Sequence, residues 1–140
     1  MPTLFTRIIE GEIPGTFVWR DDLCVAFLSI NPLRRGHTLV VPKMEIDHCI
    51  DCPPELSNHV FTVAGHIGVA LQTVFQPTRV GLMIAGLEVP HMHIHVVPMD
   101  GMRDLDFSNA AASVERGDLD DAAAAIRNEL EAMGLPGASS

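Results

Sequence analysis

The segment HMHIHVVP (residues 91–98) places three of the seven histidines of the chain at every second position. In a β-strand, successive side chains point to opposite faces, so alternate residues share one face. The spacing therefore predicts a strand in which His91, His93 and His95 form a row, with neighbouring histidines roughly 7 Å apart. Such a row suits metal binding, proton or nucleophilic chemistry, or a polar sheet edge.

Hydrophobic spacing elsewhere predicts one α+β domain. Apolar residues recur at helical intervals over residues 54–75 and again over 118–133, where Asp118 is the predicted N-cap. Short β-rich runs joined by hairpin-sized connections favour a largely antiparallel sheet. The predicted strands are TFVWR (16–20), LCVAFLSI (23–30), GHTLVVP (36–42), RVGLMIA (79–85) and MHIHVVP (92–98), and a short helix is predicted in FTRIIEG (5–11).

The composition disfavours some partners and favours others. Nine Lys and Arg residues against eighteen Asp and Glu residues give a formal net charge of −9, so a nucleic-acid polymer is a poor candidate ligand. A hydrophobic fraction of 47% is high for 140 residues and favours a homo-oligomeric interface. No apolar run approaches the roughly 20 residues that span a bilayer, and Arg7 and Glu10 interrupt the segment where a signal peptide needs an apolar core. We therefore expect a cytoplasmic protein with no membrane partner.

Metal binding and thiol chemistry are the less favoured uses of the histidine row. The segment DHCIDC adds His48, Cys49 and Cys52 as ligand types, but a zinc site needs three or four ligands that converge from separate segments. Pro53 and Pro54 interrupt the strand, CxxC and helix unit expected of a redox motif. An odd number of cysteines fits a reducing compartment, in which single buried thiols pack as small apolar side chains.

Metal-free catalysis is the favoured use. A neutral histidine is a good nucleophile near neutral pH when an acceptor holds one ring nitrogen and leaves a lone pair on the other. A neighbouring histidine can then serve as the acid for a leaving group. Three histidines in register make a merely polar sheet edge the less favoured interpretation.

The histidine row and its flanking segments resemble the histidine-triad (HIT) family, in which histidine alternates with apolar residues three times and two apolar residues follow. The resemblance extends to LFTRIIEGEIPG, DDLCVAFLSINPLRRGHTLVVPK and AGLEVPH, and it covers about residues 3–100. It is greatest to the bacterial branch that contains nucleoside phosphoramidases and dinucleotide-polyphosphate hydrolases. It implies an α+β domain over residues 1–105 with a five-stranded antiparallel sheet and two main helices, forming a homodimer. Residues 106–140 would then be an extension, with its helix at about 118–133, packed on the same domain.

The resemblance also assigns catalytic roles by position. His93 would attack the α-phosphorus of a small nucleotide, giving a nucleotidyl-histidine that water then hydrolyses. His95 would contact the phosphate and assist the leaving group. His91 would position His93, whose second nitrogen is held by a backbone carbonyl. His37 either faces the site or buttresses its strand, and the resemblance leaves both placements open.

Further residues match the family's binding positions. Gly86 and Glu88 correspond to the loop that offers backbone groups to the phosphate. Ser29 stands where the family has an aspartate that binds the ribose. The apolar purine slot would be formed by six residues that without the family are interpreted as plain core: Leu4, Phe5, Ile8, Phe27, Leu28 and Ile30.

Departures from the family pattern limit what the resemblance implies. Some bacterial members hold structural zinc through positions that are Thr3, Thr6 and Glu45 here, so we expect no metal and no cofactor. The loop before the triad is shorter and lacks its usual asparagine. The predicted activity is hydrolysis or transfer at the α-phosphate of a phosphoramidate, dinucleotide polyphosphate or nucleotide ester. The alternatives are a nucleotide-binding protein with little turnover and a metal-dependent hydrolase that uses the same histidines.

Overall fold

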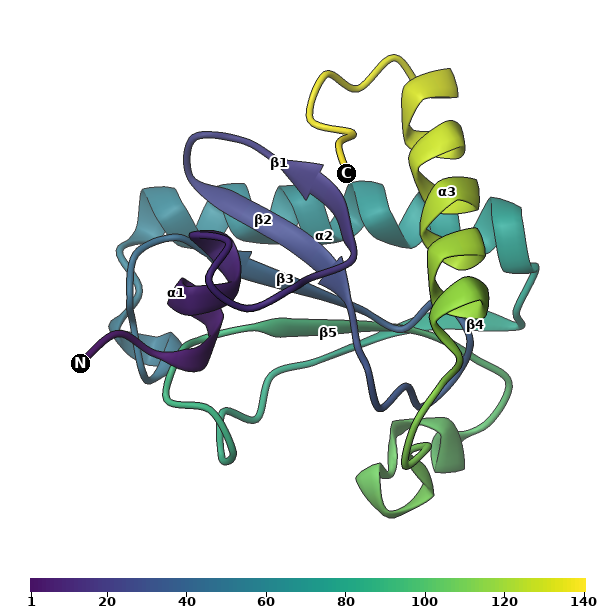
Figure 1. Cartoon of the computed structure of the whole chain (residues 1–140), viewed down its shortest axis with the longest axis horizontal. Coiled ribbons are helices and arrows are strands. Elements are labelled where there is room, and N and C mark those ends of the chain that lie inside the picture. Colours follow the sequence, from purple (N-terminus) through teal and green to yellow (C-terminus); the bar gives the residue numbers. More distant parts are fainter.

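A single five-stranded antiparallel sheet, with the strand order β1-β2-β3-β5-β4, forms the centre of the molecule. The computed structural model describes every residue from Met1 to Ser140, and the predicted α+β class with two main helices is confirmed (Figure 1). None of the helices is both long and apolar enough to cross a membrane. The elements are α1 (Leu4–Ile9), β1 (Phe17–Arg20), β2 (Cys24–Leu28), β3 (Thr38–Pro42), α2 (Pro54–Phe75), β4 (Arg79–Met83), β5 (Ile94–Met99) and α3 (Arg116–Ala132), with 3-10 turns at Cys49–Asp51, Met102–Leu105 and Phe107–Asn109.

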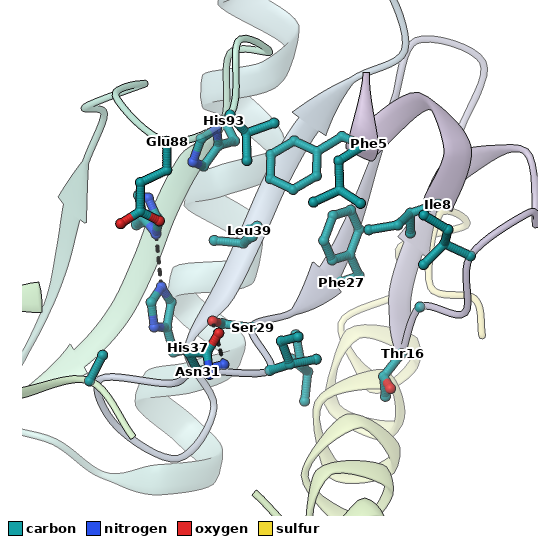
Figure 2. Close-up of a pocket in the computed structure, with 18 of the residues that line it drawn as sticks. Phe5, Ile8, Thr16, Phe27, Ser29, Asn31, His37, Leu39, Glu88 and His93 are labelled. Atoms are coloured by element: carbon teal, nitrogen blue, oxygen red, sulfur yellow. Dashed lines mark hydrogen bonds between the residues drawn. The ribbon is translucent and has the colours of Figure 1, made fainter. Parts of the chain in front are cut away.

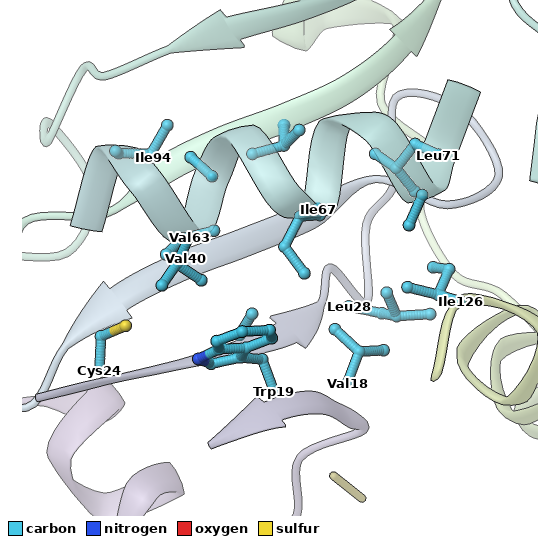
Figure 3. Packing of buried hydrophobic residues seen from close by; sticks show 14 of the residues in the cluster. Val18, Trp19, Cys24, Leu28, Val40, Val63, Ile67, Leu71, Ile94 and Ile126 are labelled. Atoms are coloured by element: carbon cyan, nitrogen blue, oxygen red, sulfur yellow. The ribbon is translucent and has the colours of Figure 1, made fainter. Parts of the chain in front are cut away.

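Side chains that alternate along the strands divide between two apolar clusters, one on each face of the sheet. Cys24, Ala26 and Leu28 of β2 lie in the larger cluster, against α2 and α3. Figure 3 shows this helix-side core, to which Ile67 of α2 and Ile126 of α3 contribute fully buried side chains. The smaller cluster lies on the opposite face, beneath α1, and contains Phe5, Ile8, Phe17, Val25, Phe27, Leu39 and Val41. Because α1 has only six residues, it covers only part of that face.

The β1–β2 turn is held by a carboxylate instead of a glycine. Asp21 accepts hydrogen bonds from the backbone N–H groups of Leu23 and Cys24, each at 2.8 Å. Its other oxygen accepts from Trp19 Nε1 at 2.8 Å and lies 2.7 Å from His59 Nε2 of α2. Burial opposes ionisation of this carboxyl, yet these hydrogen bonds lower its pKa to about 2. Asp21 therefore joins the hairpin to the long helix.

Helix α3 begins at Arg116, two residues before the predicted start, and its N-cap is Glu115 instead of Asp118. Glu115 makes no side-chain capping bond, so no capping signal in the sequence marks this end. Asp118 lies in the first turn, where a negative charge interacts favourably with the helix dipole. Its Oδ1 also accepts a hydrogen bond from Arg35 Nε at 3.2 Å. The helix ends at Ala132, and Gly134 follows with a φ of +77°.

The C-terminal segment returns to the first strand. The backbone N–H of Arg20 donates to Gly137 O at 2.9 Å, and that of Ser139 donates to Val18 O at 3.1 Å. A Cβ at Gly137 would lie 2.2 Å from the Trp19 ring, so only glycine allows this close approach. The tail and the buried face of α3 thus pack against the same sheet as the rest of the chain.

Candidate active site

The histidine row is only partly a strand. Strand β5 begins at Ile94, so His95 lies in it, whereas His91 and His93 precede it. The sequence prediction of one strand through all three is therefore wrong for the first two. In the β3–β5 register, Pro42 is the residue that would face position 92, but proline has no N–H to donate to a ladder. The backbone N–H of Met92 instead donates to Ile46 O at 2.6 Å.

His93 has one ring nitrogen held and the other free. Its Nδ1 lies 2.7 Å from the backbone carbonyl oxygen of His91, and because a carbonyl only accepts, Nδ1 carries the hydrogen. The lone pair is then on Nε2, which makes no hydrogen bond within the chain. No fully buried side-chain nitrogen or oxygen lacks a partner, so Nε2 is open to the adjoining cavity. The Phe5 ring packs nearly perpendicular to the imidazole, with an interplanar angle of 86° and the ring centroids 4.8 Å apart.

Two consecutive hydrogen bonds, through His37, fix the position of the ring hydrogen of His95. The backbone N–H of Leu33 donates to His37 Nδ1 at 3.0 Å, which leaves the ring hydrogen of neutral His37 on Nε2. That nitrogen lies 2.9 Å from His95 Nδ1 (dashed in Figure 2). His95 therefore accepts at Nδ1 and carries its own hydrogen on Nε2. His37, for which the sequence left two placements open, lines the cavity and also supports His95.

Burial keeps these rings neutral. Removal from water lowers the pKa of His37 to about 4 and that of His95 to about 3, and nearby histidines add to both shifts. Burial likewise lowers the pKa of His93, against an opposing hydrogen bond to the His91 carbonyl. The site thus holds neutral imidazoles at pH 7, one with an available lone pair and one with an available N–H.

These lowered pKa values predict acid sensitivity. Between pH 6.5 and about 4 the unfolded histidines bind protons that the folded rings do not, so stability is full above pH 6.5 and falls as the pH drops below it. We expect a loss of about 2 kcal/mol per buried ring between pH 7 and pH 5. Urea unfolding at pH 7 and at pH 5 measures this difference in the free energy of unfolding. His37→Gln should flatten the dependence and His48→Gln, at an exposed position, should not; equal wild-type stability at pH 7 and pH 5 would contradict the prediction.

The open part of the sheet face forms a cavity of about 500 Å³ beside the histidines. Figure 2 shows His93 and His37 on one side of it and Phe5, Phe27 and Ile8 on the other. All seven residues predicted to bind the nucleoside line this cavity: Leu4, Phe5, Ile8, Phe27, Leu28, Ser29 and Ile30. Their exposure differs, since Ile30 is 68% exposed at the rim, whereas the Leu28 side chain packs into the helix-side core. Phe27 and Leu28 are neighbours on a strand, so they point to opposite faces.

The predicted phosphate loop is only partly at the cavity. Glu88 lines it, whereas Gly86 does not. Gly86 has a φ of +72°, a backbone conformation that favours glycine, so it contributes to the course of the loop. His91 is also absent from the lining; it is fully buried, with its ring between Pro42 O and Thr3 Oγ1.

Part of the cavity wall comes from the C-terminal segment, which the sequence did not identify. Phe107 lies with its ring centroid 4.9 Å from that of His95, and Arg116 is the one lysine or arginine in the lining. Asn31 holds the segment in place by donating to Ala111 O at 3.2 Å and Ala112 O at 2.9 Å. Residues 106–115 carry no helical or alternating pattern, so nothing local signals that they reach the site.

Two groups of side chains bear on metal binding. Thr3, Thr6, Glu45 and His91 do not fit zinc, because threonine hydroxyls are not among its usual ligands, and they are joined by hydrogen bonds instead. The ligand atoms of Asp21, Cys24 and His59 lie within 4.8 Å of one another. Hydrogen bonds already occupy the Asp21 oxygens, and burial raises the pKa of the Cys24 thiol. This cluster is therefore a structural junction between the hairpin and α2.

Comparisons with known proteins agree with this geometry. The HIT domain family model matches residues 10–102. The chain is 34% identical over 106 residues to Protein hit of Bacillus subtilis, covering 72% of this chain and 73% of that protein. It is 30% identical over 100 residues to adenylylsulfatase HINT3 of Arabidopsis thaliana, covering 68% of this chain and 51% of that protein. The crystal structure of a Zn-bound histidine triad family protein from Mycobacterium smegmatis superposes with a TM-score of 0.79 at 26% identity, over 94% of each chain.

The matched region contains the whole sheet, α2 and all three histidines of the row. The family model covers more than half of the chain, and both curated relatives align over more than two thirds of it. This protein is therefore a member of the HIT family.

Proposed function

We propose that this protein hydrolyses small nucleotides at the α-phosphate through a covalent intermediate on His93. The observation that carries the proposal is the hydrogen bond from His93 Nδ1 to the His91 carbonyl oxygen, at 2.7 Å. It leaves the nucleophilic lone pair on Nε2, at the edge of a cavity large enough for a nucleotide.

In the first step, Nε2 of His93 attacks the α-phosphorus and a P–N bond forms. The bond from phosphorus to the leaving atom breaks, and the leaving atom keeps the electron pair and takes up a proton. His95 is the proton donor in this proposal: a bound anionic phosphate favours its doubly protonated form, and the Nε2–H of that form, which makes no bond within the chain, goes to the leaving atom. In the second step, water attacks phosphorus and gives a proton to Nε2 of His95, which lost its own proton in the first step; the P–N bond breaks, and His93 regains its lone pair.

The rest of the cavity supports a purine nucleotide as the substrate. Phe5, Phe27 and Ile8 offer an apolar wall to a base. Arg116, whose Nε is paired with Asp120 Oδ1 at 3.2 Å, places a guanidinium at the lining of a chain whose net charge is −9. The Arabidopsis relative is named an adenylylsulfatase, which supports an adenylyl group as the transferred moiety.

One experiment separates this function from its two alternatives. Adenosine and guanosine phosphoramidates and dinucleotide polyphosphates are mixed with the protein in the presence of a chelator, quenched, and analysed by intact-mass spectrometry. We expect turnover and a nucleotidyl adduct. Binding with neither turnover nor adduct would favour a nucleotide-binding protein. Turnover that the chelator abolishes would favour a metal-dependent hydrolase.

Ser29 should weaken the discrimination between ribose and deoxyribose. Its Oγ accepts the Asn31 N–H at 3.2 Å, so one neutral O–H is left for a sugar hydroxyl. A charged aspartate would contribute roughly 1.5–3 kcal/mol against about 1 kcal/mol for a neutral group. We expect similar kcat/KM values for adenosine and 2′-deoxyadenosine phosphoramidates in the wild type and a larger ratio in Ser29→Asp. A wild-type preference of about a hundredfold, or about 2.7 kcal/mol, would mean that another group binds the ribose.

We also propose that the protein works as a cytoplasmic homodimer. All three cysteines are free, which agrees with a reducing compartment. Apolar side chains are exposed on α2 at Phe61 (46%) and Val69 (54%) and on the edge strand β4 at Leu82 (46%). Light scattering after size-exclusion chromatography should give twice the monomer mass of 15.2 kDa.

A further inference from the structure

Thr3 joins the start of α1 to the histidine row. As the N-cap of α1, its Oγ1 accepts the backbone N–H of Thr6 at 3.1 Å. The same oxygen lies 2.7 Å from Nδ1 of His91, 88 residues away in the chain. Glu45, in the loop after β3, accepts the backbone N–H of Thr3 at 2.8 Å and the hydroxyl of Thr6 at 2.6 Å. We call these four residues, Thr3, Thr6, Glu45 and His91, the N-terminal clasp.

The direction of the Thr3–His91 hydrogen bond follows from the other side of the ring. Nε2 of His91 lies 2.7 Å from Pro42 O, a carbonyl that can only accept. A neutral His91 therefore has its hydrogen on Nε2 and its lone pair on Nδ1. The Thr3 hydroxyl, which has Thr6 Oγ1 at 3.2 Å as its other acceptor, donates to this nearer lone pair at 2.7 Å. Both ring nitrogens are engaged, and the side chain is fully buried.

The clasp is connected to His93 through two neighbouring residues, His91 and Phe5. His91, whose ring it holds, is also the residue whose backbone carbonyl accepts the His93 Nδ1–H. Helix α1, whose first turn the clasp fixes, carries Phe5. The Phe5 ring lies close to both His93 and His91, with centroid distances of 4.8 and 5.8 Å. Thr3 does not line the cavity, so any effect on the reaction passes through these neighbours.

We propose that the Thr3 hydroxyl is a positioning group that holds His93 in its reactive orientation by anchoring His91 and α1. This inference rests on the proposed function, in which Nε2 of His93 is the nucleophile. Two substitutions of Thr3 separate the hydroxyl from the shape of the side chain. Serine keeps the hydroxyl, whereas valine has nearly the shape of threonine but no hydroxyl.

The test compares Thr3→Val with Thr3→Ser, and uses Thr73→Val, at an exposed position on α2, as the matched control. Single-turnover mixing with an adenosine phosphoramidate gives the rate of adduct formation, and a separate titration gives the nucleotide Kd. We expect Thr3→Val to slow adduct formation about ten- to a hundredfold, since small misplacement of a reacting group has effects of this size. Its Kd should change much less, and Thr3→Ser and Thr73→Val should keep the wild-type rate. Thr3→Val also removes the side-chain cap of α1, and thermal unfolding of each variant measures the stability lost in this way.

Imidazole ¹⁵N NMR of the ligand-free proteins tests the geometry without turnover. The wild type should show a hydrogen on Nε2 of His91 and none on its Nδ1, and Thr3→Val should shift both the His91 Nδ1 and the His93 Nδ1–H signals. The proposal is overturned by an unchanged adduct rate in Thr3→Val, by an equal loss in Thr3→Ser, or by a His91 hydrogen on Nδ1. Absence of an adduct in the wild type would refute the proposed function, while the NMR comparison would still decide whether the clasp orients His93.

Discussion

Replacing His93 with asparagine is expected to reduce turnover by a factor of about a thousand or more, because the covalent route itself is lost. Asparagine can still donate a hydrogen bond to the His91 carbonyl, so the surroundings of the side chain are preserved. The fold should therefore remain intact. Steady-state kinetics on the preferred phosphoramidate gives the loss, and intact-mass spectrometry should show no nucleotidyl adduct in the variant.

The matched control is His48→Asn, which makes the same change at an exposed histidine outside the cavity. It should keep the wild-type rate and the adduct. If His93→Asn retained most of its activity, or if an adduct mapped to another residue, His93 would not be the nucleophile. Equal circular dichroism and unfolding midpoints of the two variants would show that misfolding does not cause the loss.

Shortening Ile126 to alanine is expected to lower the free energy of unfolding by about 2–5 kcal/mol, the usual cost of such a cavity in a core. Ile126 is fully buried in the helix-side core, where α3 meets α2 and the sheet. We propose on this basis that residues 106–140 belong to the same cooperative unit as residues 1–105. A single urea transition, shifted to a lower midpoint with an unchanged slope, would support this.

Ile50→Ala is the control for this experiment, since Ile50 is 76% exposed and its loss should change stability by no more than about 0.5 kcal/mol. A loss in Ile126→Ala as small as that in Ile50→Ala would contradict the proposal. So would a separate early transition confined to the C-terminal segment, because α3 would then unfold without the sheet.

The sequence could predict elements that carry strong local signals. The apolar periodicity of residues 54–75 agrees with α2, and the alternating or continuous apolar runs agree with β1, β2, β3 and β4 to within a few residues. The start of α3 was missed because Glu115 makes no capping bond. The start of β5 was missed because it depends on Pro42, a residue of another strand, which cannot pair with the backbone at position 92.

For the candidate site, the sequence by itself determined which residue types are available: the alternating histidines, the apolar slot residues, and a serine and two threonines at positions where the family resemblance implies other side chains. Only the tertiary structure decided which ring nitrogens carry hydrogen, which side chains are buried and which residues contact the histidines. The free nitrogen of His93 depends on a neighbouring carbonyl, and that of His95 depends on His37, 58 residues away. The burial that lowers their pKa values, the contact of Phe107 with His95, and the Thr3–His91 bond all need distant segments to meet. Hydrogen-bond direction and desolvation are set by three-dimensional neighbours, which local patterns along a chain do not specify.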